Sequence, residues 1–209
     1  MKKILILLIA FSFTVNAQMT DEIKQLQKQW AIINYQIEKG KKVEAFEKLA
    51  KAATQIVISN PKNAHALVWE GIVYSTYAGV ASTFSAGKLA KHAKKSFEQA
   101  IKIDDSVLNG SAYTSLGVLY YKVPGWPLSF GSDKKAMKHL KKGIELNPTG
   151  IDSNYFYAEF LFDEEDDYKL AKQYILKAQK AAPRPTRPLA DSGRQNEVAV
   201  LMKKIDEEL

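Results

Sequence analysis

The feature of this chain that most constrains its fold is an internal repeat. A pattern that returns along a sequence predicts a stack of similar units rather than one irregular domain. Three segments share one order of small and large apolar residues, and a weaker copy over residues 30–61 precedes them. The shared positions are Gly71, Tyr74, Ala93, Phe97 and Ala100 in the first segment, Gly117, Tyr120, Ala136, Leu140 and Gly143 in the second, and Ala158, Leu161, Ala171, Ile175 and Ala178 in the third.

The order of residues in each segment predicts a pair of packed helices. A small residue at Gly71, Gly117 and Ala158 lets the two helices approach closely, and large side chains at other positions fill the space left between them. Prolines 148 and 183 follow the second and third segments, where proline ends a helix and redirects the chain. Three segments in register make an accidental match improbable.

This pattern resembles the tetratricopeptide repeat (TPR), a helix–turn–helix unit of about 34 residues. The resemblance implies an all-α fold, a right-handed TPR-like α-solenoid of three to four helix pairs. We place the repeats at about residues 22–61, 64–105, 110–148 and 151–183. A stack of this kind needs a closing element, because its last unit exposes an apolar face. Apolar residues at helical spacing predict a C-terminal capping helix over residues 189–209; they are Val198, Leu201, Ile205 and Leu209.

The N-terminus has the pattern of a secretory signal peptide over residues 1–17. A basic start precedes an apolar run at residues 4–13, which is shorter than the roughly 20 residues of a bilayer span, and small residues follow at Val15-Asn16-Ala17. A retained membrane anchor is the alternative. We expect a mature single domain over residues 18–209, periplasmic or secreted, with no membrane insertion after signal cleavage.

Composition excludes several classes of function. The chain has no cysteine, so disulfides, thiolate metal sites, cysteine nucleophiles and a lipidated N-terminal cysteine are absent. Its 30 basic and 23 acidic residues form no arginine-rich strip with interleaved aromatics, so no nucleic-acid partner is expected. His65, His92 and His139 fall in three different places and belong to no catalytic motif. We therefore expect no enzyme activity, no cofactor and no metal site; the acidic run at residues 163–167 lacks calcium-loop spacing.

Two of the turns inside repeats are enlarged. The spacing from Tyr74 to Ala93 is 19 residues and that from Tyr120 to Ala136 is 16, against 10 in the third repeat. Insertions in repeat proteins map to loops on one face, often a binding face. The first insertion, around residues 81–87, consists mostly of small residues and is expected to lengthen both helices of its pair.

The second insertion carries rigid and large residues together. Prolines 124 and 127 restrict the backbone, Gly125 allows a tight turn, and Trp126 and Phe130 are large anchors. A loop ordered in advance favours specific binding. Two interpretations stay open: the aromatic side chains pack back against the solenoid edge, or they grip a partner.

A closer resemblance covers most of the chain between residues 64 and 201. The segments YYKVPGWPLSFG (120–131), NPTGIDSNYFYAEFL (147–161) and APRPTRPLADSGR (182–194) resemble periplasmic repeat proteins of the TRAP-transporter T-component type. That resemblance implies an oligomer that works with a periplasmic substrate-binding protein on small, often hydrophobic or anionic ligands. Many members of the family are lipoproteins, and this chain lacks the lipidation cysteine.

The third of these segments is rich in arginine. Its prolines predict an extended stretch that holds Arg184 and Arg187 apart before the cap helix begins. Asp191 then either starts the helix in a pair with Arg187 or Arg194, or leaves these two arginines as a fork for a carboxylate near the Trp126 loop.

The first helix of the last repeat opens with polar residues. Asp152, Asn154 and Tyr155 are expected on the concave face of the solenoid, with helix capping as the alternative role of Asp152. Asn and Lys residues that would clamp an acidic peptide terminus are replaced on this face by apolar residues and threonine.

Two functional hypotheses remain. In the first, the protein is an interaction scaffold that docks a protein partner, such as a substrate-binding protein, or its own copies. In the second, it holds a small apolar or anionic solute in a cavity between helices. An exposed Trp126 favours the scaffold, and a Trp126 that lines a closed pocket beside Arg187 favours the solute. The chain alone names neither the partner nor the ligand, and it does not fix the oligomeric state.

Overall fold

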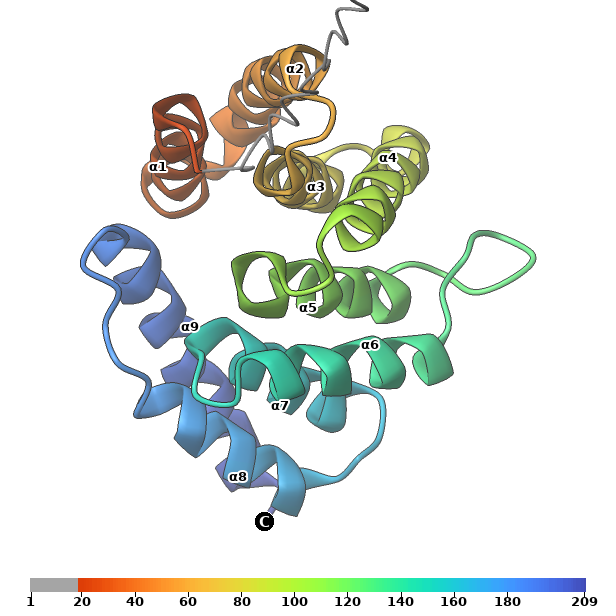
Figure 1. The fold of residues 1–209 in the computed structure, drawn as a ribbon. Helices are drawn as coiled ribbons and strands as arrows, with labels where there is room; N and C mark the ends of the chain where they lie inside the picture. Colours follow the sequence, from red (N-terminus) through yellow and green to blue (C-terminus); the bar gives the residue numbers. More distant parts are fainter. Residues whose placement is uncertain (1–18) are drawn as a thin grey trace, which may run out of the picture.

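The computed structural model describes residues 19–209 (Figure 1). The signal peptide predicted over residues 1–17 lies outside the described residues. The described part of the chain forms nine α-helices, with a short 3-10 turn at Lys39–Lys41. Their bounds are α1 Asp21–Gln36, α2 Lys42–Ser59, α3 Ala64–Val80, α4 Thr83–Ile103, α5 Val107–Lys122, α6 Asp133–Leu146, α7 Ile151–Asp163, α8 Tyr168–Gln179 and α9 Pro188–Glu207.

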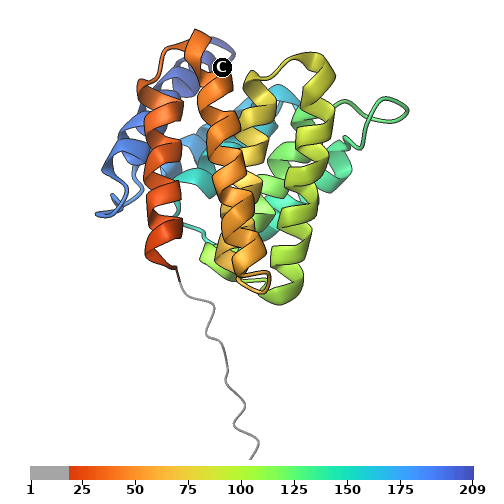
Figure 2. The ribbon, with the colours of Figure 1, turned by 90° about the horizontal axis from the view of Figure 1, so that it is seen from above.

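Consecutive helices pack side by side as the pairs α1–α2, α3–α4, α5–α6 and α7–α8, and the pairs stack in chain order (Figures 1 and 2). This confirms the all-α, TPR-like solenoid that the repeat predicts. Polar residues just before four helices start them, because their side-chain oxygens accept a hydrogen bond from a free backbone N–H of the first turn. These residues are Thr20, Asn63, Ser132 and Asp167.

The small residues of the repeat lie where the helices of a pair meet. A Cβ atom on Gly71 of α3 would overlap the ring of Phe97 on α4, and one on Gly117 of α5 would lie 2.7 Å from Leu140 Cγ on α6. Both distances are shorter than a side chain tolerates, so glycine sets the spacing of these helix pairs. The packing role that the repeat pattern predicts for Gly71 and Gly117 is therefore present in the fold.

The two insertions have different structures. The first lengthens its helices, as predicted: α3 and α4 span 17 and 21 residues, whereas α7 and α8 span 13 and 12. The second forms an irregular loop between α5 and α6 that projects from the body of the molecule (Figures 1 and 2). Before this loop, α5 itself begins irregularly, because Leu108, Asn109 and Gly110 all have left-handed backbone conformations.

The helix α9 joins both ends of the solenoid. Its second half places Val198, Leu201 and Ile205 in the larger core, which runs from α3 to α9, and so caps the last repeat. Its first half places Ala190 in the smaller core, which otherwise consists of residues from α1, α2 and α3. The predicted capping helix therefore also reaches back to the first repeat.

Contacts between α9 and α1 close the inner layer into a ring. Each of the helices α1, α3, α5, α7 and α9 packs on the next, and α9 packs on α1 again. The closure point is tight, because the ring of Tyr35 on α1 packs against Gly193 on α9, where any Cβ atom would overlap it. The other four helices, α2, α4, α6 and α8, form the outer layer.

Candidate central binding cavity

The ring of inner helices surrounds a cavity of about 1210 Å³. All five inner helices contribute lining residues, as does the segment 182–187 before α9. The exposed surface of the walls is mainly apolar, and all five helices also contribute polar side chains; the arginines and Asp152 lie near the starts of α9 and α7. Ligand sites in proteins commonly combine apolar walls, which provide burial, with polar groups that fix orientation.

Aromatic side chains form the wall nearest α1 and α3. Trp30 and Trp69 meet edge to face with their ring centroids 6.0 Å apart, and Tyr35 packs edge-on against Trp30 at 5.9 Å. The indole N–H of Trp30 donates to Thr76 Oγ1 at 2.9 Å, which fixes the orientation of its ring. Burial raises the pKa of the Tyr35 phenol to about 12, so its hydroxyl stays protonated at neutral pH.

Asp152 and two arginines form an ion-pair network in the part of the cavity wall made by α7, the segment before α9, and α9. Arg184 donates from Nη1 to Asp152 Oδ2 at 2.7 Å, and Arg194 donates from Nε to Asp152 Oδ1 at 2.9 Å. Arg194 also pairs with Glu197 and lies over the ring of Phe156 at 4.3 Å. Burial alone would raise the pKa of Asp152, but the adjacent guanidinium groups outweigh burial and hold that pKa well below its usual range.

Arg187 lies at the same end of the cavity without an acidic partner among the described residues. Its guanidinium carbon is 5.1 Å from the centre of the Trp69 ring, and its Nε is buried without a hydrogen-bond acceptor. Burial, together with the neighbouring charge of Arg184, lowers the pKa of Arg187. The cavity thus presents one half-buried cation whose charge the described side chains do not directly pair.

Two predictions about the arginine segment are wrong. Asp191 pairs with Arg184, which donates from Nε at 2.7 Å and from its backbone N–H at 2.6 Å, rather than with Arg187 or Arg194. Residues 184–187 form a turn instead of an extended stretch, because the backbone N–H of Arg187 donates to the carbonyl of Arg184 at 2.8 Å. That turn brings the three arginines together around Asp152 and does not hold them apart.

The polar residues at the start of α7 have separate roles. Asp152 lines the cavity, as expected, and its side chain pairs with arginines instead of capping the helix. Asn154 is buried and donates to the carbonyls of Pro148 and Gly150 at 3.0 and 2.8 Å, so it holds the turn between α6 and α7. Tyr155 faces a second, smaller pocket instead of the central cavity.

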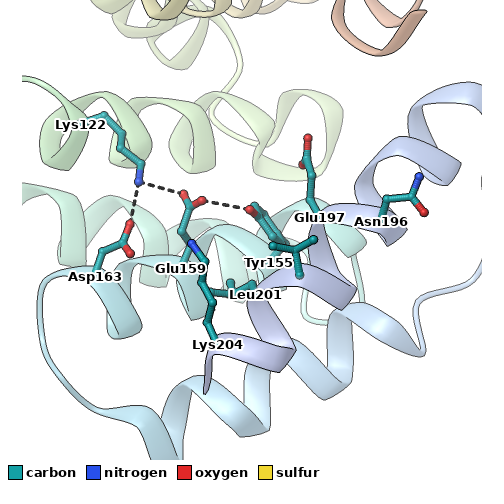
Figure 3. Close-up of a pocket in the computed structure, with 9 residues that line it drawn as sticks. Lys122, Tyr155, Glu159, Asp163, Asn196, Glu197, Leu201 and Lys204 are labelled. Atoms are coloured by element: carbon teal, nitrogen blue, oxygen red, sulfur yellow. Dashed lines mark hydrogen bonds and ion pairs between the residues drawn. The ribbon is translucent and has the colours of Figure 1, made fainter. Parts of the chain in front are cut away.

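The smaller pocket, of about 390 Å³, lies between α5, α7 and α9 (Figure 3). Glu159 is its centre: it accepts hydrogen bonds from Tyr155 Oη at 3.0 Å and from Tyr121 Oη at 2.5 Å. Lys122 Nζ lies 3.4 Å from Glu159 and 2.7 Å from Asp163, and Figure 3 shows these groups converging. Each of these polar groups has a partner, so the cluster ties α5 to α7 and offers no free group to a ligand.

The predicted loop residues do not join the arginines. Pro124, Gly125, Trp126 and Pro127 lie in the α5–α6 loop, on the opposite side of the molecule from the start of α9 (Figure 1), and they line neither of the two pockets. A carboxylate fork formed by Arg187 and Arg194 next to the Trp126 loop is therefore wrong.

Trp126 and Phe130 also differ from each other. Trp126 is 90 % exposed, whereas Phe130 is half-buried, with its ring edge-on to Tyr120 at 5.8 Å between centroids. The prediction that these aromatics pack back on the solenoid holds for Phe130 and fails for Trp126. The exposure of Trp126 is what the scaffold hypothesis expects.

Sequence reasoning missed the aromatic wall. Trp30 appeared only as part of a weak repeat copy, and Trp69 and Tyr35 were not singled out. A signal was present in the sequence, because three large aromatics at the first helices of two adjacent repeats fall on the inner layer of a TPR-like stack.

Two further classes of feature are absent from residues 19–209. In this range no helix combines the length and apolar character of a membrane span. The same residues contain no cluster of three or more His, Asp or Glu side chains arranged to hold a metal ion.

The fold defines a TPR-like helical-repeat protein with a large central cavity. No protein-family model matches the chain. A stretch of 68 residues is 38 % identical to the sol locus transcriptional repressor of Clostridium acetobutylicum, which covers 32 % of this chain and 19 % of that protein. The chain thus spans about a fifth of that curated relative. The crystal structure of MamA aligns with a TM-score of 0.47 and 19 % identity over 81 % of this chain and 92 % of that one.

Proposed function

We propose that this protein is a non-enzymatic interaction scaffold whose central cavity receives the end of a partner polypeptide. The observation that supports the proposal is the cavity itself, which is surrounded by one helix from each of the four repeats and by α9. Its volume of about 1210 Å³ is above the range of roughly 300–1,000 Å³ that is common for drug-sized ligands. A short peptide segment would fill such a volume, and the mixed apolar and polar lining suits its alternating side chains and its backbone groups.

The identity of the partner is a finer proposal. The three sequence segments that resemble TRAP-transporter T-components favour an accessory role beside a periplasmic substrate-binding protein. Residues 147–161 and 182–194 of those segments include Asp152, Arg184, Arg187 and Arg194, which line the cavity. An exported location and a cleaved signal peptide belong to the same proposal.

A cavity-filling variant tests the scaffold function. Ser115 on α5 lines the cavity and is half-buried, so Ser115→Trp fills the space without disturbing the contact between α5 and α6. We expect the wild-type chain to capture a partner from the cell envelope, which mass spectrometry identifies and a binding assay with the purified partner verifies. This binding should be lost with Ser115→Trp and kept with Val43→Ser on the outer helix α2. Equal capture by both variants would exclude the cavity as the docking site.

A small anionic solute is the second candidate ligand. Arg187 favours it, because a half-buried cation without an acidic partner beside an indole ring suits a carboxylate on an apolar body. Native mass spectrometry of the protein purified from its own cells distinguishes the two ligands: a solute adds a few hundred daltons, by the size of typical ligands, and Arg187→Met abolishes that adduct. A polypeptide partner leaves no such adduct on the isolated chain.

A further inference from the structure

The most exposed large apolar side chains of the described residues lie at the two enlarged turns. Phe84, at the start of α4, is 99 % exposed; Trp126 and Leu128, in the α5–α6 loop, are 90 % and 82 % exposed. No other large apolar side chain in residues 19–209 exceeds 63 %. Figure 2 shows the α3–α4 turn and the projecting loop on the same side of the molecule.

The two ends of the α5–α6 loop are fixed to the body of the molecule, and the loop carries Trp126 and Leu128 outward. Gly131 donates from its backbone N–H to the carbonyl of Pro124 at 2.9 Å, and a Cβ atom on Gly131 would overlap the backbone of Val123. Phe130 packs on Tyr120, and Lys94 of α4 lies 5.7 Å from the Phe130 ring centre. The base of the loop is therefore fixed beside α4, and Trp126 stands clear of it.

Exposed lysines follow both of these turns along the chain. On α4, Lys88, Lys91 and Lys95 follow Phe84 at spacings of four, seven and eleven residues, so all four exposed side chains share one helix face. On α6, Lys134, Lys138 and Lys141 form a similar exposed row directly after the loop. Residues 83–97 contain no acidic residue, and residues 122–144 contain only Asp133.

We propose that this lysine–aromatic face, formed by Phe84, Trp126, Leu128 and the exposed lysines of α4 and α6, binds the surface of an anionic lipid bilayer. The apolar tips would enter the headgroup region, where aromatic rings are preferred, and the lysines would lie against anionic headgroups. This is a peripheral contact, distinct from a membrane span.

Charge and shape favour a bilayer over an acidic protein as the occupant. A protein interface buries a continuous apolar patch against a complementary surface. Here the three apolar side chains belong to two separate turns, and exposed lysines follow each turn along α4 and α6. A fluid headgroup layer accepts separated apolar tips without matching their shape, and it supplies negative charge over the whole face.

Vesicle sedimentation with the expected mature chain, residues 18–209, tests the proposal. The probes are phosphatidylcholine vesicles with and without about a third of phosphatidylglycerol. We expect wild-type binding to the anionic vesicles to fall about tenfold or more in Phe84→Ser/Trp126→Ser/Leu128→Ser and in Lys88→Glu/Lys91→Glu/Lys95→Glu. The matched controls are Val43→Ser/Ile58→Ser, which removes exposed apolar side chains on α2, and Lys169→Glu/Lys180→Glu/Lys203→Glu, which makes the same charge change elsewhere.

The controls should bind like the wild type, because they leave the lysine–aromatic face unchanged. Fluorescence adds a local readout: anionic vesicles should shift the emission of the wild type to the blue and leave Trp126→Phe unshifted, because Trp30 and Trp69 are already buried. Wild-type binding by both target variants would overturn the proposal. Equal loss of vesicle binding in the target and control variants would also overturn it. So would unchanged vesicle binding together with a changed oligomeric state in the target variants, which would assign the face to a protein contact.

Discussion

The two halves of α9 contact opposite ends of the molecule with different chemistry. The second half buries Val198, Leu201 and Ile205 in the larger core. The first half closes the inner ring through a small residue, Gly193, and carries Arg194 into the ion-pair network of the cavity wall. One helix therefore contains a segment that stabilises the core and a segment whose polar residues line the central cavity.

The largest effect on stability should come from a substitution in the second half of α9. Ile205 is fully buried, so Ile205→Ala removes apolar contacts and leaves a cavity, at a cost of about 3 kcal/mol in the free energy of unfolding. Urea denaturation measures this cost. Val200→Ala on the same half, 60 % exposed, should change stability by less than about 0.5 kcal/mol. A similar loss in both variants would show that α9 contributes little specific packing there.

The next largest effect on stability should come from the contact between Tyr35 and Gly193 that closes the inner ring. In Gly193→Ala the added methyl group overlaps the ring of Tyr35, and forced repacking should cost about 2 kcal/mol. A double-mutant cycle isolates this contact. In a Tyr35→Ala background, Gly193→Ala should be neutral or stabilising by up to about 1 kcal/mol, because alanine favours the helix over glycine. An equal cost in both backgrounds would mean that Tyr35 is not the obstacle.

The ion-pair network of the first half should respond to acid. The folded-state pKa of Asp152 is held below its ordinary value of 3.8, so Asp152 contributes stability that is present above pH 3.8 and lost as pH falls further. Asp152→Asn should cost about 1–2 kcal/mol at neutral pH, since it removes the carboxylate that joins the two arginines and leaves Arg184 paired only with Asp191 and Arg194 only with Glu197. The stability difference between wild type and Asp152→Asn should shrink as the pH is lowered below 3.8. A difference that stays constant over that range would exclude a charge effect.

The smallest effect on stability should come from Arg187, which precedes α9. Arg187→Met keeps an apolar stem over Trp69 and removes a cation without an acidic partner, so stability should change by less than about 1 kcal/mol. Thermal unfolding checks this expectation, and anion binding to the cavity should be lost at the same time. A large destabilisation would show that Arg187 serves the fold rather than a ligand.

The sequence allowed the stacking of helices to be predicted, because packing within a helix pair is local. Gly71 and Phe97 lie on α3 and α4, the two helices of one pair, which a single loop connects. Their contact therefore follows from the repeat pattern alone. The contact between Tyr35 and Gly193 depends on the curvature accumulated over four helix pairs, which no local pattern specifies. The same holds for the distance between the Trp126 loop and the arginines, and this is why the predicted fork near the loop was wrong.

Pairing among charged residues was only partly predictable. Asp191 lies close in sequence to three arginines, and spacing alone did not identify Arg184 as its partner. The turn at residues 184–187 decides the pairing, and the prolines that surround it had suggested an extended chain. Asp152 was singled out from its place at the start of a helix, but its role in joining two arginines required the three-dimensional arrangement.

The closed inner ring has a topological consequence. A cavity bounded on all sides by helices cannot admit the middle of a long chain from the side, so a polypeptide can enter only by threading a free terminus along the axis. The other route requires α9 to detach from α1 at Gly193, which makes that contact a gate. For an occupant too bulky to thread along the axis, the exchange rate should be set by the rate at which this gate opens, and a variant that loosens the gate should speed both arrival and release while affinity changes little.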